Sequence, residues 1–142
     1  MDDCIFCKIV SGEAESSKVY EDEDVIGFLD LHPINQGHTL VISKKHATNI
    51  YDISIQDLEK ISQVTQKLAI RIKKVLNADG ISIFQMNERG GDQDVMHYHV
   101  HIIPRHEGDW FGGEIMKAIK RQSVTNPTRE ELNSIAAKIN KV

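Results

Sequence analysis

The stretch His97-Tyr98-His99-Val100-His101-Ile102-Ile103 alternates polar and apolar side chains by twos. Because successive side chains of a β-strand point to opposite faces, this period predicts a strand with three imidazoles on one face and apolar side chains on the other. A slip of one residue would carry all three imidazoles into the core, so burial of the apolar face fixes the register. We therefore predict a strand over residues 98–103 that ends at Pro104.

The rest of the chain predicts further strands and helices. Ser54 followed by Asp57 is typical of a helix start, and apolar residues at helical spacing predict a long amphipathic helix that ends before Gly80. Thr128 and Glu131 mark a similar start for a C-terminal helix. A helical turn is expected at 4–10, and the other strands at 18–21, 25–30, 39–42 and 81–86. Together these elements predict an α+β fold with a mainly antiparallel sheet.

Length and composition are those of one globular domain. The chain has 142 residues, 40% of them apolar and 27% charged, so residues 1–142 are predicted to form a single domain. A net charge of -4 argues against binding nucleic acid through its phosphate backbone. No run approaches the ~20 apolar residues of a membrane span, and the acidic start lacks the basic residues of a signal peptide. With only 2 cysteines, we expect a cytoplasmic protein that contacts neither membrane nor nucleic acid.

Three imidazoles on one strand face allow three interpretations. They can be ordinary polar side chains, although strict alternation of three is unusual for that. A His-x-His pair can bind zinc, but neighbours on one face lie roughly 6–7 Å apart, so a flat strand hardly directs all three at one ion. A neutral imidazole can also attack phosphorus while its neighbours donate protons to phosphoryl oxygens. We favour catalysis by the middle ring, His99, with Nδ1 bonded to the backbone and Nε2 available.

The spacing Cys4-x-x-Cys7 indicates a second kind of site. Zinc ligands, a redox pair and two buried thiols all fit it, but a redox pair is disfavoured because hardly any room for a strand precedes residue 4. Two thiolates do not complete a tetrahedral zinc site. His46 is the best isolated candidate for a third ligand, and His97 could supply the fourth from the strand edge. We predict a structural zinc with no open position for catalysis, and buried free thiols are the alternative.

Residues 97–103 resemble the signature of the histidine triad (HIT) family of nucleotide hydrolases and transferases, His-φ-His-φ-His-φ-φ with φ hydrophobic. The likeness extends upstream through the segments 4–9, 28–31, 33–42 and 44–46. It implies a HIT-like fold with a five-stranded sheet, a core at 4–105 and a C-terminal extension at 106–142. It also implies a homodimer whose sheets join side by side, no organic cofactor, and zinc on the two cysteines, His46 and His97.

The resemblance implies a role for each catalytic position. His99 would attack the α-phosphorus of a purine nucleotide and form a covalent nucleotidyl-histidine that water then hydrolyses. His101 would contact the phosphate, and His97 would support the site. His38 would lie across the phosphate and the catalytic histidine, and Asp30 would accept hydrogen bonds from the ribose hydroxyls.

The remaining nucleotide contacts follow from the same resemblance. An apolar slot would enclose the base, lined by Phe6, Ile9, Phe28 and Leu31. Each of these side chains alone is equally typical of ordinary core packing. Asn87 and Gln93 would approach the phosphate and the leaving-group side.

One loop departs from the family pattern. Members commonly read Gly-Gln-(Ser or Thr)-Val before the triad, whereas this chain reads Asp92-Gln93-Asp94-Val95. The preceding loop is one residue shorter, and Arg89 stands where glycine is frequent. A carboxylate at Asp94 would repel phosphate unless it turns away or a cation or proton neutralises it, which bears on substrate, rate and the role of Asn87. Asp92 and Asp94 are also typical of a solvated loop.

These observations predict a hydrolase that cleaves nucleoside phosphoramidates or dinucleoside polyphosphates at the α-phosphorus through a nucleotidyl-His99. Two alternatives stay open: a non-catalytic nucleotide-binding or interaction module of the same fold, and a metal-dependent site that uses the triad. Trp110 lies just after the triad strand and would equally well cover the pocket or close a core edge.

Overall fold

The computed structural model describes residues 3–109 and 128–140. The chain divides into two units, Met1–Glu107 and Gly108–Val142, of which the first holds the sheet and the sites described below. In the second unit the described element is α4 (Arg129–Asn140). No helix within the described ranges is both long and apolar enough to cross a membrane. A single domain over residues 1–142 stays a prediction.

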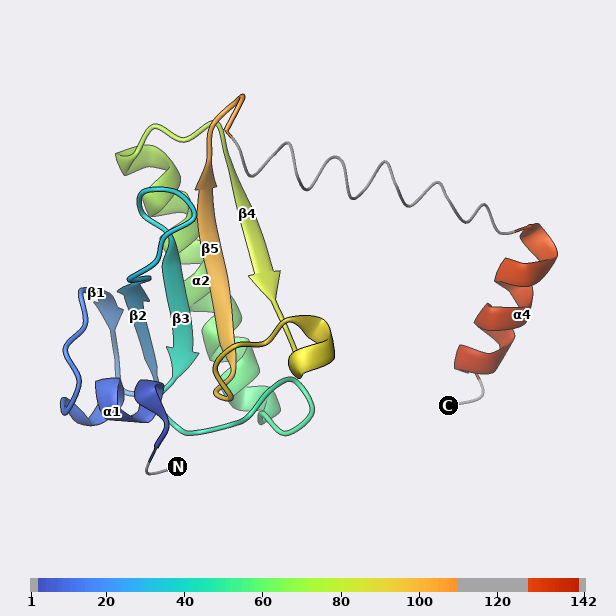
Figure 1. Cartoon of the computed structure of the whole chain (residues 1–142), viewed down its shortest axis with the longest axis horizontal. Helices are drawn as coiled ribbons and strands as arrows, with labels where there is room; N and C mark the ends of the chain where they lie inside the picture. The colour runs from blue at the N-terminus through green and yellow to red at the C-terminus, as the bar shows by residue number, and fades with distance from the viewer. Residues whose placement is uncertain (1–2, 110–127, 141–142) are drawn as a thin grey trace. The chain divides into compact units, whose positions relative to one another are not determined.

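Five antiparallel strands form one sheet in the order β1-β2-β3-β5-β4 (Figure 1). Their bounds are Lys18–Glu21 for β1, Val25–Leu29 for β2, Thr39–Ser43 for β3, Gly80–Gln85 for β4 and His99–Arg105 for β5. The strand that carries the histidines lies between β3 and β4, so it has a neighbour on each side. The predicted α+β fold with a five-stranded antiparallel sheet is confirmed.

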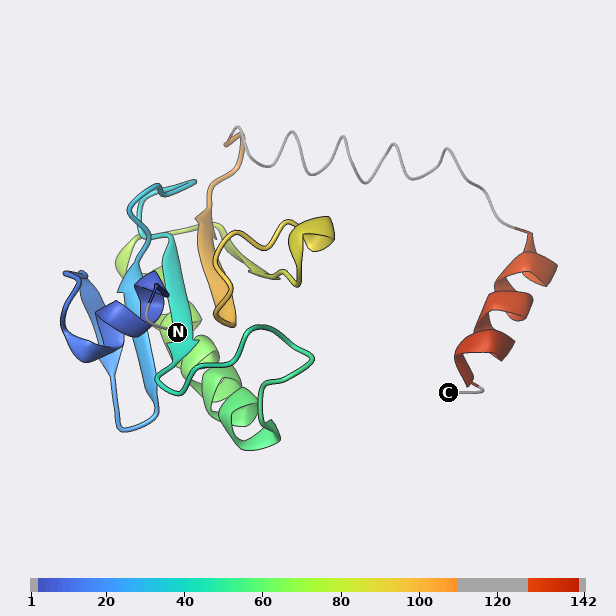
Figure 2. The same ribbon diagram turned by 60° about the horizontal axis from the view of Figure 1, so that its bottom comes forward.

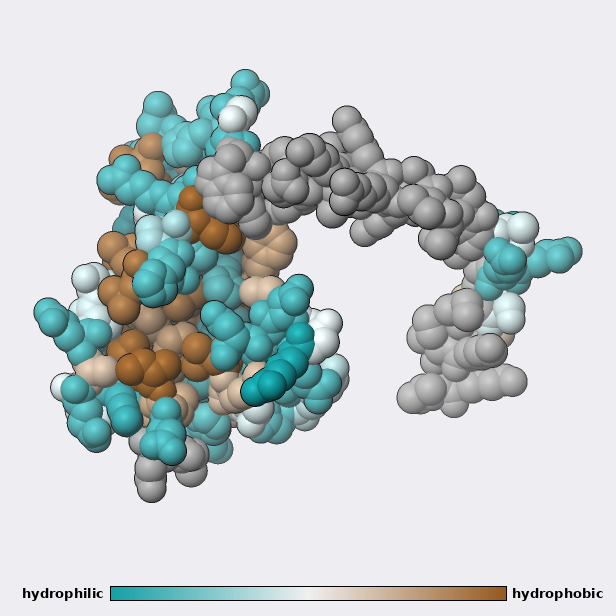
Figure 3. Space-filling view, viewed as in Figure 1, coloured by the Kyte–Doolittle hydropathy of each residue, from teal (hydrophilic) through white to brown (hydrophobic). Residues whose placement is uncertain are grey.

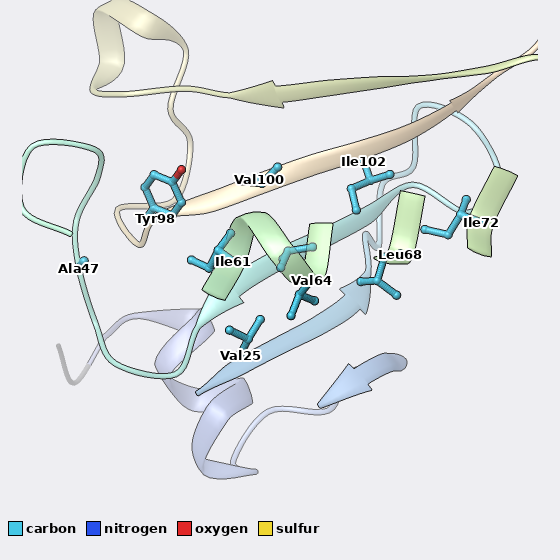
Figure 4. Packing of buried hydrophobic residues seen from close by; sticks show 10 residues of the cluster. Val25, Ala47, Ile61, Val64, Leu68, Ile72, Tyr98, Val100 and Ile102 are labelled. Carbon is cyan, nitrogen blue, oxygen red and sulfur yellow. The ribbon is translucent and has the colours of Figure 1, made fainter. Parts of the chain in front are cut away.

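Helix α2 (Ile55–Val75) covers one face of the sheet. Its residues at helical spacing pack on strand residues that share one side of the pleat, and Figure 4 shows the two rows facing each other. The helix contributes Ile61, Val64, Leu68 and Ile72, and the strands contribute Val25, Val41, Val100 and Ile102. Val41 pairs with Val100 across β3 and β5, which sets the apolar face of the triad strand against α2. The predicted amphipathic helix and the predicted apolar strand face therefore meet.

Helix α1 (Ile5–Ser11) lies over the opposite face (Figures 1 and 2). Its buried residues Phe6 and Ile9 join a second apolar cluster that also holds Ile26, Phe28, Leu40 and Ile42. The helix ends where Gly12 adopts a left-handed conformation, with φ 83°, that favours glycine at this position. The helical turn expected at 4–10 is confirmed, and α1 packs on the face of the sheet that carries the histidines.

The predicted helix starts are confirmed by their capping bonds. The Ser54 side chain accepts from the Asp57 N–H at 3.1 Å and donates to the Asp57 carboxylate at 2.8 Å, which begins α2. At α4 the bonds are reciprocal, because the Glu131 N–H donates to Thr128 Oγ1 and the Thr128 N–H donates to Glu131 Oε2. Both caps satisfy backbone donors that a helix start leaves without an intrahelical partner.

The end predicted for the triad strand is wrong. Strand β5 continues through Pro104 to Arg105, and Pro104 pairs with Ile81 of β4. Strand β3 pairs with β5 only as far as Ile102, so Pro104 lies where β5 has a single strand neighbour. A missing proline N–H is tolerated at such an edge, whereas it would break a ladder bond in the middle of a sheet.

Candidate functional site

The three triad histidines are buried. His97 lies two residues before the start of β5 and is 0% exposed, His99 is 3% exposed and His101 is 7% exposed. His99 lies opposite Ile42 and His101 opposite Leu40 on β3, so both rings share the face that α1 covers. Burial of all three rings excludes an ordinary solvated strand face, because such side chains would lie in water.

The ring of His99 is oriented by the backbone. Its Nδ1 lies 2.7 Å from the carbonyl oxygen of His97. A carbonyl only accepts, so Nδ1 carries the proton and the neutral ring keeps a lone pair on Nε2. The edge of the Phe6 ring packs beside His99, with ring centroids 5.2 Å apart. His99 therefore presents an unprotonated Nε2 in a fixed direction, as expected from the sequence, and its role as a nucleophile stays a prediction.

A chain of hydrogen bonds fixes the proton positions on two further histidines. The Ile34 N–H donates to His38 Nδ1 at 3.1 Å, so a neutral His38 carries its proton on Nε2. His38 Nε2 lies 2.9 Å from His101 Nδ1 and donates to it, which leaves the proton of His101 on Nε2. Within the described residues, His101 Nε2 is buried and has no hydrogen-bond partner. It is an N–H donor that awaits an acceptor.

Burial keeps these rings neutral. Removal from water, helped by the neighbouring rings of His99 and His38, lowers the pKa of His101 to about 4. Burial also lowers the pKa of His38, although the Asp30 carboxylate, with Oδ2 3.6 Å from His38 Nε2, opposes the shift. Near neutral pH, His38 and His101 therefore hold the tautomers that the hydrogen bonds select.

A pocket of about 310 Å³ opens in front of His99 and His101. Its lining includes five further residues that the sequence assigns to a nucleotide site, namely Phe6, Ile9, Phe28, Asp30 and Leu31. Figure 3, which views the α1 side of the sheet, shows apolar side chains gathered beside α1 with polar side chains around them. The volume and the mix of apolar walls with few polar groups are typical of a small-molecule site.

Sequence reasoning missed several lining residues. Glu15 and Ser16 reach the pocket from the segment between α1 and β1, and His32 also lines it. The other apolar lining residues that sequence reasoning missed are Ile5, Leu29, Leu40 and Val95. No residue pattern points to Glu15 or Ser16, because their place depends on how α1 folds back over the sheet.

Asn87 and Gln93 are not among the residues that line this pocket. Gln93 is 4% exposed, and its amide donates to the carbonyls of Thr48 and Val95 and accepts from the Glu88 N–H. Asn87 Oδ1 accepts from the Ile50 N–H at 2.9 Å. These bonds fix the loop before the triad, and an approach of either amide to a phosphate stays a prediction.

The loop that Gln93 fastens has an unusual backbone. Glu88 and Asp92 both have positive φ, 61° and 66°, and the ψ of 168° at Glu88 belongs to a region favoured by glycine. The loop carries Asp94, whose Oδ1 lies 3.3 Å from His99 Nε2. The sequence left open whether this carboxylate turns away from the catalytic ring, and it does not.

The two cysteines meet two histidines beside the pocket. His97 Nδ1 lies 3.5 Å from Cys4 Sγ and 3.6 Å from Cys7 Sγ, and His46 Nδ1 lies 3.3 Å from Cys7 Sγ. All four ligand atoms lie within 4.8 Å of one another. The sulfur and nitrogen ligands of one tetrahedral zinc are separated by about 3.5 Å, so this spacing fits the ion.

His97 is oriented for metal binding. Its Nε2 donates to the carbonyl oxygen of Ser43 at 2.8 Å, which leaves the Nδ1 lone pair directed at the cysteines. Burial lowers the pKa of His97 to about 4, so the ring is neutral, as a ligand must be. Burial and the adjacent Cys4 raise the pKa of the Cys7 thiol, a cost that a divalent cation would reverse. The four predicted zinc ligands therefore lie close together.

Trp110, which the sequence placed either over the pocket or at a core edge, lies outside the described residues.

Comparison with known proteins identifies the family. The HIT domain model matches residues 11–108. A HIT family member from Bacillus subtilis is 36% identical, with a TM-score of 0.83 over 98% of this chain and 96% of that one. A zinc-bound histidine triad family protein from Mycobacterium smegmatis is 38% identical, with a TM-score of 0.74 over 77% and 79% of the two chains. A HIT family hydrolase from Legionella pneumophila is 33% identical, with a TM-score of 0.67 over 76% and 97%. This chain belongs to the histidine triad (HIT) family.

Proposed function

We propose that the protein is a nucleotide-binding hydrolase that cleaves purine nucleotide substrates at the α-phosphorus through His99. The observation that carries this proposal is the hydrogen bond from His99 Nδ1–H to the His97 carbonyl at 2.7 Å, which leaves Nε2 facing an apolar pocket. The HIT family hydrolase from Legionella pneumophila, similar over 76% of this chain, supports the same class of activity.

The reaction has two displacements. His99 Nε2 attacks the α-phosphorus, and the bond to the leaving group breaks to give a nucleotidyl-histidine. Water then attacks the same phosphorus, which releases the nucleoside monophosphate and restores the neutral ring. The donor His101 Nε2–H, buried without a partner among the described residues, is suited to bond a phosphoryl oxygen as negative charge builds there.

The remaining pocket residues suit a nucleoside. Phe6 and Phe28 pack edge to face with centroids 5.4 Å apart, and they line the pocket with Ile9 and Leu31 as an apolar wall for a purine. Asp30 Oδ1 accepts from the His32 N–H, and its carboxylate retains acceptor capacity for ribose hydroxyls. His38 acts as a positioning residue, because its bond to Nδ1 directs the donor of His101 into the pocket.

The test is a search for the covalent intermediate. Wild type and His99→Ala are mixed rapidly with an adenosine 5′-phosphoramidate, quenched in denaturant and weighed intact. We expect an adenylyl adduct and turnover in wild type, with neither in the variant, while a fluorescent adenosine monophosphate analogue binds both. Binding without turnover in wild type would select the alternative of a non-catalytic module, and turnover by the variant would refute His99 as the nucleophile.

We also propose that Cys4, Cys7, His46 and His97 hold one structural zinc. The spacing of the ligand atoms supports this, as does the zinc-bound relative from Mycobacterium smegmatis. The ion would tie α1 to the segment before β5 and hold the carbonyl of His97 in place for His99. Elemental analysis of purified protein tests it: near one equivalent of zinc is expected, with a large loss in the double variant Cys4→Ser/Cys7→Ser.

A homodimer in which the two sheets join side by side is the assembly we propose. Strand β4 lies at the edge of the sheet, and its residue Ile83 is 54% exposed beside the equally apolar Ile70 of α2, which is 66% exposed. Ile83 and Ile70 line one hollow between the two elements. Sedimentation equilibrium is expected to give twice the chain mass of 16.1 kDa, and Ile83→Lys is expected to give the monomer.

A further inference from the structure

Asp94 touches the atom on which the proposed reaction depends. Its Oδ1 lies 3.3 Å from His99 Nε2 and accepts from the Val95 N–H at 2.9 Å, so a backbone bond aims the carboxylate at the ring. The Asp94 side chain is 72% exposed, whereas that of His99 is 2% exposed. The carboxylate therefore lies on the solvent side of the nucleophile. In an in-line displacement the leaving group lies opposite Nε2 across the phosphorus and departs towards solvent.

The pair lacks a proton in the reactive state. When His99 Nδ1–H donates to the His97 carbonyl, His99 Nε2 carries a lone pair and no proton. An ionised carboxylate can only accept a hydrogen bond, so neither group can donate one to the other. Two acceptors 3.3 Å apart repel each other unless positive charge lies beside them. This position therefore favours a positively charged group and disfavours a negatively charged one.

The surroundings of Asp94 do not neutralise it. The pocket in front of His99 is lined by the carboxylates Glu15, Asp30 and Asp94, with no lysine or arginine among the described lining residues. A second hollow of about 480 Å³ shares Asp94 with the first and adds Asp3, again without a lysine or arginine in its described lining. Sites that take polyphosphates normally supply lysine, arginine or a metal to offset their charge.

A metal ion is the other occupant that this geometry suggests. Asp94, His99 and His101 offer ligand atoms within 4.8 Å of one another. However, His38 donates to His101 Nδ1, so the nitrogen of His101 that points into the pocket carries a proton and has no lone pair for a metal. If His101 Nδ1 instead donated to His38 Nε2, a neutral His38 would carry its proton on Nδ1. That proton would then point at the Ile34 N–H, and two donors would face each other. The hydrogen bonds thus oppose a metal and favour an organic cation.

We propose that Asp94 forms a leaving-group subsite that selects positively charged amines, so that the preferred substrates are nucleoside 5′-phosphoramidates of cationic amines. The inference rests on the proposed function and specifies the substrate of that same site. As the bond between His99 Nε2 and phosphorus forms, the phosphorus–nitrogen bond breaks and its electron pair goes to the amine nitrogen, which takes one proton from solvent water to leave as an amine and a second to become an ammonium group. Asp94 stabilises the ammonium groups of the departing amine, whereas a departing nucleotide would bring several negative charges next to it.

Three substrates that differ in one terminal group test the charge preference. Adenosine 5′-phosphoramidates of 1,3-diaminopropane, butylamine and β-alanine end in an ammonium, a methyl and a carboxylate, and diadenosine tetraphosphate adds a polyanionic leaving group. For wild type we expect kcat/KM for release of adenosine monophosphate to fall in that order. The ratio between the ammonium and carboxylate substrates should be on the order of tenfold, the range for a partly exposed charge pair.

Asp94→Asn removes the charge and keeps the shape, and Asp94→Ser is a second variant should the first fold poorly. Either change should bring the ammonium-to-carboxylate ratio close to one. Asp92→Asn is the matched control, because it removes a carboxylate from the same loop, lies outside both hollows and keeps a residue suited to a φ of 66°. It should retain the wild-type ratio. Raising the salt from about 0.05 M to about 0.5 M should reduce the wild-type ratio, because the Debye length shortens.

Each other outcome overturns the inference in a recognisable way. Equal rates for the three amines in wild type, or a ratio that Asp94→Asn and Asp94→Ser leave unchanged, refutes the subsite while the His99-dependent turnover still supports the proposed function. A second equivalent of Zn²⁺ that wild type binds and both Asp94 variants lose assigns the position to a metal instead. Absence of any His99-dependent turnover refutes the proposed function and the subsite with it.

Discussion

Two groups of histidines lie side by side in this protein. They differ in which ring nitrogen bonds to the backbone and which is left available for a ligand or a substrate. In the metal corner, formed by Cys4, Cys7, His46 and His97, the Nε2–H of His97 bonds to the Ser43 carbonyl and Nδ1 faces the thiols. In the pocket, the Nδ1–H of His99 bonds to the His97 carbonyl and Nε2 faces the cavity. In the functions that we propose, one residue type would thus serve as a zinc ligand at His97 and as a nucleophile at His99, because a backbone carbonyl accepts the N–H of the other ring nitrogen in each case.

The comparison predicts that the two groups can be disrupted separately, and the largest effect belongs to the metal corner. Removal of zinc by a chelator, or Cys7→Ser, should lower the free energy of unfolding by more than about 5 kcal/mol, because metal binding contributes folding energy. The melting temperature should fall by about 10–20 °C. Calorimetry with and without chelator measures this. Turnover lost at a temperature where the zinc-free protein is still folded would contradict a purely structural ion.

In the pocket, His101→Ala should reduce turnover strongly and stability little, the opposite of what zinc removal should do. Loss of the Nε2–H donor should reduce kcat about 10²–10³-fold, the usual cost of one donor to a developing oxyanion. The melting temperature should change little beyond the loss of ring packing, and zinc content should stay near one equivalent. Steady-state kinetics and elemental analysis check both. A loss of zinc in this variant would show that the two groups are not independent.

In the zinc-free protein, acid should lower the free energy of unfolding through one histidine of each group, His97 and His101. Burial holds the pKa of His97 and of His101 at about 4, against roughly 6.5 in an unfolded chain. Between these values the unfolded state binds more protons than the folded state, so stability is full above about pH 6.5 and falls as the pH drops towards 4. Allowing for solvent screening, we expect about 2 kcal/mol from each ring.

Urea unfolding of the zinc-free protein at several pH values measures this dependence. His101→Asn serves as the control, since it removes one of the two titrating rings. It should reduce the slope of the free energy of unfolding against pH. An unchanged slope in this variant would show that His101 does not contribute to acid sensitivity.

The smallest effect concerns Asp30. Asp30→Ala should raise KM for adenosine substrates about tenfold through loss of a charged acceptor, with kcat less affected. A 2′,3′-dideoxyadenosine phosphoramidate is the matched substrate, because it has no ribose hydroxyls to lose. Equal KM increases for both substrates would show that Asp30 acts through His38, whose Nε2 is 3.6 Å away, rather than on ribose.

Much of the fold could be predicted, because the decisive patterns are local. Alternation over residues 97–103 defines the strand and its two faces, and the capping pair Ser54 and Asp57 defines the start of α2. The exception is Pro104, which stays within β5 because its position relative to the end of β3 is not visible in the sequence. The grouping of the histidines and cysteines could be predicted because these residue types carry the chemistry themselves, and the roles assigned to them stay predictions.

The sequence alone determined which side chains this protein has for its chemistry and, by their period of two, which of them share a strand face. Only the tertiary structure decided which nitrogen of each ring is available, because the acceptors and donors that fix the protons, such as the Ser43 carbonyl and the Ile34 N–H, come from distant segments. It also decided that Asp94 faces His99, through a loop whose backbone is fastened by the buried amide of Gln93. Proton positions and charge contacts depend on three-dimensional neighbours, and spacing along the chain does not encode them.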